Sequence, residues 1–568
     1  MHGFICVIPL KNQVSSIEFT WKKPFDFQGK MTKRRIDNAS YQLEQFTSKK
    51  FIDEKQWVDN DDFMFVSEGV IVNLSILKKE HNEKNLEKHF LKLYENDKLF
   101  FQQLEGSFSG IFCDKRKNIW YAFNNQSHTK RLYYFQHENH LILSTDLFTL
   151  ANAMRELKYE TSLDEQAAYL LLTSRFVLEN LTLISGVKQL RAGEYLTFQN
   201  GKLTTDFYFH LENIKESQHS KNEIIENLNN KFIQAIKFNH EIDLKYNFNH
   251  LTTLSGGLDS RTELIYAYEN GFNKQTALNF SQKGYADQII SKKIANSLNI
   301  PIFQFTVLPD ALKAIDEIIS VNDGMITYSG CFHIFSILNQ ADYGHFGAVH
   351  TGIMGDTVMG SYVTNDKNQL RKRLYAIDKK LQIPDDFINN LLSNYQSDEL
   401  SMIYNTVFIG ESNGFQFFDL IGETMSPFLN TDFMSYAFSI PSELKKDSKI
   451  YIDWLKKYQP KTTEFTWETL ACKPTNNQFL RQFHRYKRAA IKRLPFKTMW
   501  KHNHAPAQFW YENNEDVMNY LDAYFYENVD RIDNTKLKSD LLDLYKERSF
   551  TVKANCITLV GAVKLLFG

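Results

Sequence analysis

Six residues near the middle of the chain, Ser255-Gly256-Gly257-Leu258-Asp259-Ser260, indicate both the local fold and its chemistry. They follow the strand-like run Leu251–Leu254 and precede a helical pattern over Thr262–Glu269. A Gly-Gly turn that opens a helix directs several backbone N–H groups to one point, and the helix dipole reinforces this anion site. Ser255 and Ser260 add hydroxyl donors, and Asp259 adds a hard oxygen ligand for Mg²⁺. The stretch therefore predicts a cradle for pyrophosphate.

Other phosphate and acyl-transfer loops fit this stretch less well. It lacks the Lys of a Walker A loop, so it is not built for transfer of a γ-phosphate. It also lacks the G-x-S-x-G spacing of a hydrolase elbow. An ordinary strand–turn–helix would show the same pattern, so the loop needs support from the rest of the chain.

A second element, Thr351-Gly352-Ile353-Met354-Gly355-Asp356, supplies that support. It also follows a strand-like run, Ala348–Gly352, and it offers two glycines and one carboxylate. Two such loops at neighbouring strand ends could hold one nucleotide, with Asp259 and Asp356 sharing its Mg²⁺. A single acid would more often be a solvated side chain, so the pair carries the interpretation.

Strands and helices alternate around these loops. The apolar pattern predicts strands over Thr276–Phe280 and Pro301–Val307 and a helix over Asp287–Leu298, while residues beyond about Leu370 are mostly helical. Alternation of this kind predicts a parallel sheet that binds its ligand at the carboxyl ends of the strands.

The first 210 residues have a different, strand-rich pattern. Short apolar runs are bounded by polar residues or Gly at Phe4–Ile8, Phe63–Val66, Gly69–Val72, Gly110–Cys113 and Arg131–Phe135. A helical stretch covers Asn85–Glu95, and Asn200-Gly201 predicts a hairpin turn. The polar segment Glu212–Lys221 then leads to a helix near Glu223–Lys237. We therefore expect one domain over residues 1–210 and a second over residues 211–568.

Bulk composition favours a globular enzyme of at least two domains. The chain has 568 residues and a net charge of −1, which gives no support for binding nucleic acid or a membrane surface. Its five cysteines show no CxxC spacing, which argues against a disulfide framework or a zinc knuckle. We find no signal peptide and no apolar run of the ~18–20 residues that a membrane span requires. A cytoplasmic location is the expectation.

The whole chain resembles the asparagine synthetase family of amide ligases. Ser255–Ser260 looks like the PP-loop of ATP pyrophosphatases, and Thr351–Asp356 occupies the place of the family's S-G-E-G-x-D motif. Other matching segments lie in both halves: Gly106–Asp114, Arg131–Tyr134, Thr182–Gly193 and Ser426–Asn430 with Pro441 and Lys445. The resemblance implies an N-terminal αββα sandwich of the N-terminal-nucleophile type and a C-terminal parallel-sheet PP-loop domain with additional helices.

The resemblance also implies a reaction and a set of site residues. The family uses ATP with Mg²⁺ to adenylate a carboxylate, releasing pyrophosphate, and then transfers ammonia or another amine to the acyl group. Thr253, Leu254, Phe280, Thr351 and Gly352 would line the adenosine. Asp259 and Asp356 would serve as metal ligands in catalysis. Lys473 would face the pyrophosphate, although a plain surface lysine is an equal alternative.

The N-terminal half departs from the family where its glutaminase chemistry should lie. The catalytic Cys that follows the initiator Met is replaced by His2, and Cys6 lies in a strand pattern typical of a buried residue. Glu68 replaces an Asn donor of the oxyanion hole with an acceptor. The family's R-G-P-D stretch is not recognisable around Arg34–Asp37. We therefore predict a folded but inactive glutaminase domain.

The C-terminal half departs at Ile353, which replaces the family's Glu, and at Thr357. We expect a ligase that joins ammonia or an amine to a small-molecule, peptide or sugar carboxylate, without a nucleic-acid or membrane partner; a homodimer remains open. Glutamine-dependent asparagine synthesis is the nearest alternative, disfavoured by His2 and Glu68. A non-catalytic nucleotide-binding scaffold and another PP-loop activity, such as thiolation, are more distant ones.

Overall fold

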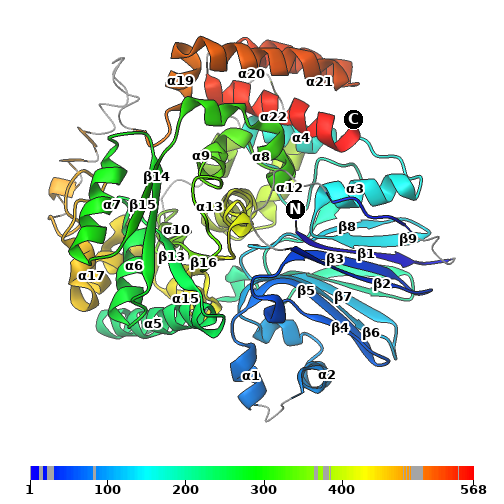
Figure 1. Cartoon of the computed structure of the whole chain (residues 1–568), viewed down its shortest axis with the longest axis horizontal. Helices are drawn as coiled ribbons and strands as arrows, with labels where there is room; N and C mark the ends of the chain where they lie inside the picture. The colour runs from blue at the N-terminus through cyan, green and yellow to red at the C-terminus, as the bar shows by residue number, and fades with distance from the viewer. Residues whose placement is uncertain are drawn as a thin grey trace.

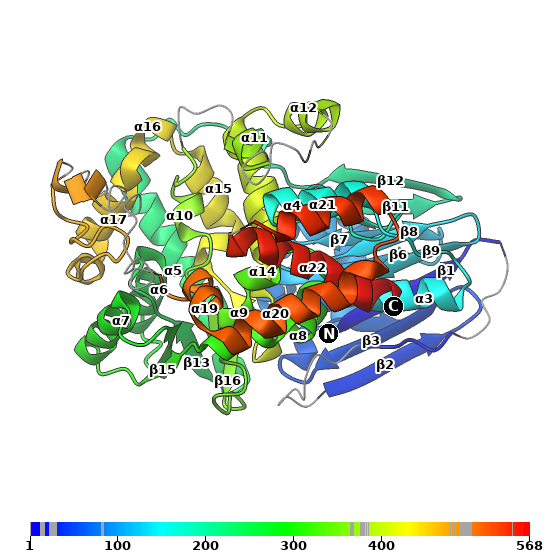
Figure 2. The same cartoon turned by 90° about the horizontal axis from the view of Figure 1, so that it is seen from above.

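The computed structural model describes the chain apart from residues 1, 12–16, 22–30, 81–84, 364–368, 375–380, 382, 384, 478, 482, 485, 488–502 and 548. Two sets of antiparallel strands lie on one side of the molecule and a parallel sheet lies on the other (Figure 1). The last helices of the chain cross over both parts, as Figure 2 shows from above.

The N-terminal part contains two six-stranded antiparallel sheets. The first has the order β10 (Lys188–Gln189), β8 (Tyr133–Gln136), β9 (His140–Ser144), β1 (Gly3–Pro9), β3 (Gln42–Ser48) and β2 (Met31–Asp37). The second has the order β12 (Lys202–Phe207), β11 (Glu194–Gln199), β7 (Ile119–Asn124), β6 (Gly106–Asp114), β5 (Phe63–Ile71) and β4 (Trp57–Asp59).

Apolar side chains on both faces of these sheets produce four layers. In β5, Met64 and Val66 pack against β1 of the other sheet, whereas Phe63 and Phe65 pack under α2 (Leu86–Asn96). Helix α1 (Leu74–Glu80) lies on the same outer face, and α3 (Leu147–Glu156) and α4 (Glu165–Ser174) cover the outer face of the first sheet. Because successive side chains of a strand alternate between faces, an all-apolar strand must be covered on both sides. The predicted αββα sandwich is confirmed.

The C-terminal part is built on a five-stranded parallel sheet with the order β15 (Ile302–Thr306), β14 (Gln275–Ser281), β13 (Asn249–Thr253), β16 (Phe346–His350) and β17 (Thr424–Met425). Helices α5 (Lys221–Lys245), α6 (Leu258–Glu269) and α7 (Ala286–Ser297) cover one face. Helices α8 (Ile315–Asn322) and α9 (Phe332–Phe335) cover the other. The predicted parallel sheet with helices is thus confirmed, although β13 and β16 each begin two residues before the expected runs Leu251–Leu254 and Ala348–Gly352 and end one and two residues before their ends.

The remaining helices lie after β16 in the sequence. Short ones are α10 (Gly355–Val358), α11 (Gln369–Leu374), α12 (Asp385–Ser393), α13 (Asp398–Met402), the π-helix η6 (Ile403–Glu411), α14 (Ser412–Phe415), α16 (Ser442–Lys445) and α19 (Ala507–Asn513). Longer ones are α15 (Thr431–Ser439), α17 (Lys449–Tyr458), α20 (Glu515–Asn528), α21 (Thr535–Tyr545) and α22 (Phe550–Phe567).

Helix α22 corrects one expectation about apolar segments. Its 18 residues are long and apolar enough, by length and composition alone, to cross a membrane, but 72% of the segment is buried within the protein. It packs against α4, α8, α20 and α21, and Asn555 donates a hydrogen bond to the Leu172 carbonyl of the N-terminal part (2.9 Å). These contacts are those of a core helix.

Candidate functional site

The predicted nucleotide loops lie at one edge of the parallel sheet. Strands β13, β14 and β15 progress outward in one direction, and β16 and β17 lie on the other side of β13. The strand order therefore reverses between β13 and β16, which is where open α/β sheets bind ligands. Ser255–Ser260 follows β13, and Thr351–Asp356 follows β16, so both loops emerge at this point.

Short hydrogen bonds shape the first loop. The N–H of Ser255 donates to Ser260 Oγ (2.9 Å), and the N–H of Gly257 donates to Ser255 Oγ (3.1 Å). The N–H of Gly256 donates to Asp287 Oδ1 (2.7 Å) at the start of α7. These three N–H groups are occupied by side-chain oxygens of the protein, so at the N-terminus of α6 they can turn to a phosphate group only when these internal hydrogen bonds open.

The second loop lies directly against the first. A Cβ atom on Gly352 would lie 2.3 Å from the backbone nitrogen of Ser260, and one on Gly355 would lie 2.7 Å from Asp259 Cγ. Both glycines are therefore required by close approach rather than by an unusual φ angle. The contact places the N–H of Asp356 3.1 Å from Asp259 Oδ2, to which it donates.

This contact brings together the two carboxylates that the sequence singled out. Burial, and then the negative charge of Asp356, raises the pKa of Asp259 to about 8. Burial also raises the pKa of Asp356. Two acids that resist ionisation side by side form a favourable donor set for a divalent cation, whose charge removes that resistance. The pair fits the Mg²⁺ expected here.

Two further residues fix this geometry, and sequence reasoning did not find them. The hydroxyl of Tyr451, on α17, donates to Asp259 Oδ1 (2.9 Å). The buried guanidinium of Arg261 donates to the carbonyls of Gly257 (2.7 Å) and Thr466 (2.7 Å). Arg261 immediately follows the loop, so its position was a usable signal; Tyr451 is remote in sequence and gave none.

The residues predicted to line the adenosine lie at the same edge of the sheet. Thr253 ends β13 and Leu254 follows it, Phe280 lies near the end of β14, and Thr351 and Gly352 follow β16. Leu254 and Thr351 are buried, and Thr253, Phe280 and Gly352 are partly exposed. Their role in binding stays a prediction.

Lys473 is exposed on a loop that contacts the pyrophosphate cradle. The loop is closed by an isolated bridge between Trp467 and Cys472, and the N–H of Glu468 donates to the Gly256 carbonyl (2.9 Å). Lys473 therefore follows a segment anchored to the first loop. This placement is compatible with a role at the pyrophosphate and with a surface lysine, so the assignment stays a prediction.

The N-terminal part lacks an accessible nucleophile at the positions considered. Cys6 is fully buried between the two sheets, and burial raises the pKa of its thiol well above the ordinary value. His2 is also buried, and burial lowers the pKa of its imidazole. The buried location predicted for Cys6 is confirmed, and it makes a thiolate unfavourable.

A chain of buried ion pairs surrounds Glu68. Glu68 Oε1 lies 3.2 Å from Lys55 Nζ, which lies 2.9 Å from Glu423 Oε1 of the C-terminal part. Lys130 Nζ lies 2.7 Å from Glu423 Oε2 and 2.8 Å from Asp419 Oδ2. We call these five residues the ion chain. Glu68 thus acts as a hydrogen-bond acceptor and as the partner of a lysine. This is consistent with its predicted inability to stabilise an oxyanion, which needs a donor.

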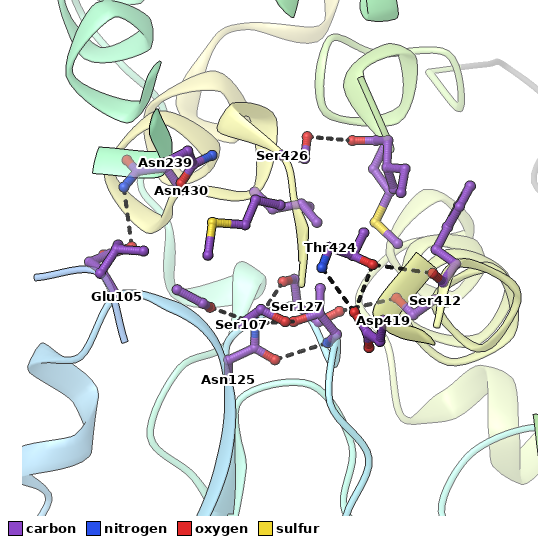
Figure 3. A pocket seen from close by; sticks show the side chains of 18 of the residues that line it. Glu105, Ser107, Asn125, Ser127, Asn239, Ser412, Asp419, Thr424, Ser426 and Asn430 are labelled. Carbon is purple, nitrogen blue, oxygen red and sulfur yellow. Dashed lines mark hydrogen bonds between the residues drawn. The ribbon is translucent and has the colours of Figure 1, made fainter. Parts of the chain in front are cut away.

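A small cavity joins the two parts beside the ion chain (Figure 3). Glu105, Ser107 and Asn125 line it from the N-terminal part, and Asp419, Ser426 and Ile353 line it from the C-terminal part. The cavity has a water-accessible volume of about 40 Å³, enough for about three waters. Burial raises the pKa of Glu105 to about 7. Ile353 lies three residues before Asp356, so the loop that carries this carboxylate also borders the cavity.

Residues 247–404 match the family model described as "Asparagine synthase". The protein named "Putative asparagine synthetase (glutamine-hydrolyzing) 2" of Methanocaldococcus jannaschii is 25% identical over 390 residues, covering 64% of this chain and 73% of that protein.

Two solved structures show weak likeness. The glutamine phosphoribosylpyrophosphate (PRPP) amidotransferase from B. subtilis complexed with ADP and GMP has a TM-score of 0.22 at 9% identity, covering 49% of this chain and 79% of that chain. A structure of the allosteric regulatory enzyme of purine biosynthesis has a TM-score of 0.23 at 8% identity, covering 49% and 78%.

Proposed function

We propose, from the premise that residues 247–404 form an asparagine synthase domain, that this protein is an ATP-dependent ligase that makes an amide through an acyl-adenylate. The observation that carries the proposal is the contact between the two loops, which holds Asp259 beside Asp356 at the N-terminus of α6.

The reaction would proceed in two steps, adenylation of the carboxylate and formation of the amide. A substrate carboxylate oxygen attacks the α-phosphorus of ATP, and the bond to the pyrophosphate oxygen breaks. Ammonia or an amine then attacks the acyl carbon, loses a proton and expels AMP. Negative charge grows on the departing pyrophosphate, where the loop N–H groups and the hydroxyls of Ser255 and Ser260 would stabilise it. Asp259 and Asp356 would hold Mg²⁺, which neutralises phosphate charge when bound.

The amine would come from outside the N-terminal part. Cys6 is buried, position 2 carries His, and Glu68 is held by Lys55. These features support a first domain that releases no ammonia from glutamine. The name of the M. jannaschii relative includes glutamine hydrolysis, so the opposite result must be tested directly.

Exchange of labelled pyrophosphate into ATP tests the adenylation step. We expect exchange that depends on a carboxylate substrate and Mg²⁺ and that falls about 10²-fold or more in Asp259→Asn, because a metal ligand is lost. Asp310→Asn is the matched control, since that carboxylate is exposed in the same domain. Unchanged exchange in Asp259→Asn would refute the metal role.

Ammonia release from glutamine distinguishes a ligase that hydrolyses glutamine from one that uses free ammonia or an amine. We expect none from the wild-type protein while added ammonia or an amine supports AMP formation. Release that stops in Cys6→Ala, with ammonia-dependent turnover preserved, would contradict the proposed inactive first domain.

A further inference from the structure

Three histidines and a glutamate meet in the core, beneath the nucleotide loops. His240 is on α5, His250 on β13, Glu263 on α6 and His350 at the end of β16. All four side chains are fully buried. One ring nitrogen of each histidine lies within 4.8 Å of one from each of the others. Glu263 Oε1 lies 3.8 Å from both His240 Nε2 and His350 Nδ1.

Each histidine has one nitrogen fixed by an acceptor. His250 Nδ1 lies 2.8 Å and His350 Nε2 lies 2.7 Å from Asp243 Oδ2, and His240 Nδ1 lies 3.0 Å from the Ile236 carbonyl. A carboxylate and a carbonyl only accept, so these three nitrogens must carry the protons. The opposite nitrogens, His240 Nε2, His250 Nε2 and His350 Nδ1, therefore present lone pairs.

Within the described part of the chain, these lone pairs and both Glu263 oxygens have no hydrogen-bond partner. Five buried acceptors without a donor are costly, since each unsatisfied buried polar group loses ~1–3 kcal/mol. A protonated Glu263 would not repair this, because 3.8 Å is too long for a hydrogen bond. A neutral ring that donates from one nitrogen to Asp243 or to the Ile236 carbonyl keeps its opposite nitrogen able to bind a cation.

We propose that His240, His250, His350 and Glu263 form a structural zinc site. Three neutral imidazoles and one carboxylate, with no thiolate, are a donor set that suits Zn²⁺, whereas Mg²⁺ and Ca²⁺ prefer oxygen ligands. The charges balance in the core, because Zn²⁺ is neutralised by Glu263 and Asp243. Asp243 would orient two of the ligands, which is the usual arrangement around zinc-bound histidines.

The surroundings of Asp243 show that the site is built from several elements. Asp243 Oδ1 accepts from the N–H of Ala348 (2.8 Å), and a Cβ on Gly347 would lie 2.1 Å from that oxygen.

Binding of zinc would require a small adjustment of the ligand side chains. Tetrahedral zinc places its ligand atoms about 3.3 Å apart, so the 3.8 Å contacts must shorten. The rings of His240 and His350, now parallel at 3.7 Å, must also rotate apart.

Metal analysis of the full chain, produced without a histidine tag in zinc-containing medium, tests the site. We expect about one zinc per chain, lost in His350→Gln and Glu263→Gln. His128→Gln is the matched control, because His128 is equally buried and its Nδ1 donates to the Phe408 carbonyl (3.2 Å) outside the cluster. Asp243→Asn should lower zinc affinity about 10–100-fold.

A second measurement covers variants that fail to fold. The wild-type protein stripped with a chelator and loaded with Co²⁺ should show the intense visible absorption of a tetrahedral centre, and Zn²⁺ should abolish it. Stripping should lower the melting temperature and Zn²⁺ should restore it. Absence of metal as purified, together with no Co²⁺ spectrum and no Zn²⁺-dependent stabilisation, would overturn the proposal whether or not the ligase reaction is found.

Discussion

The raised pKa of Asp259 has a direct consequence for ligand binding. At pH 7 a carboxyl with a pKa of about 8 is mostly protonated, and it must ionise to coordinate a cation. The proton is held in the folded state between the ordinary pKa of Asp and about 8. This group therefore makes the folded state less stable as pH rises through that window, and Mg²⁺ offsets the loss.

We therefore predict that binding of ATP with Mg²⁺ at pH 7 releases protons and that the release fades above about pH 9.5. Calorimetry in two buffers with different ionisation enthalpies measures the number released. Asp259→Asn should remove most of it. Equal binding heats in the two buffers at pH 7 would contradict the shifted pKa.

Lys473 provides a second test for a single side chain. If it faces the pyrophosphate, Lys473→Ala should slow exchange about 10²–10³-fold while leaving ATP affinity within a few fold, because the charge matters most as pyrophosphate departs. Lys461→Ala is the control, since Lys461 is an outlying cation paired with Glu269. Normal exchange in Lys473→Ala would establish the surface-lysine alternative.

The sequence predicted some residues of the site better than others. Asp259 and Asp356 were found because each follows a strand and a glycine-containing turn, and strand order then brings them together. Tyr451 touches Asp259 from a helix 192 residues away, and no local pattern marks it. The histidine cluster was missed for the same reason, because its members lie on separate elements without a metal-binding spacing.

At the scale of elements, strand positions were predictable and strand continuity was not. The runs Phe63–Val66 and Gly69–Val72 were expected as separate strands, but β5 passes through both. Gly69 lies within it at φ 91°, where a Cβ would meet the Ser107 carbonyl oxygen at 2.1 Å. Gly69 does not end the strand, and its missing side chain permits close approach to the neighbouring strand.

The contact between the two loops can be tested by substituting the glycine that permits it. Gly352→Ala places a methyl group against the backbone of Asp259 and Ser260, so one loop must move away from the other. We expect a loss of stability of about 1–3 kcal/mol and a much larger loss of pyrophosphate exchange. Gly330→Ala is the control, because a Cβ there has 3.8 Å to its nearest neighbours. Full exchange in Gly352→Ala would show that the loops act independently.

The whole molecule is held together by the ion chain as well as by apolar packing. Burial alone would lower the pKa of Lys55, but the charges of Glu423 and Glu68 outweigh it, so the pKa is raised. The pKa of Glu423 is lowered, since the charges of Lys130 and Lys55 outweigh its burial. Its stabilising contribution is therefore complete at neutral pH and is lost only in acid.

We predict that Glu423→Gln lowers the free energy of unfolding by about 1.5–3 kcal/mol, because Lys55 and Lys130 lose a shared partner but keep Glu68 and Asp419. Asp543→Asn, which removes an exposed carboxylate paired with Lys546, should change it by less than about 1 kcal/mol. Urea unfolding at neutral pH measures both. Equal effects would mean that the buried ions are compensated from elsewhere.

Helix α22 has one more consequence for the covalent chain. The polypeptide passes between its two parts through the exposed stretch 215–220, yet its final helix returns to rest on α4. A protease that cuts the exposed stretch would sever the backbone without releasing either piece. The nicked protein would migrate as one particle, because the packing of α22 on α4 would hold the two fragments together without the peptide bond between them.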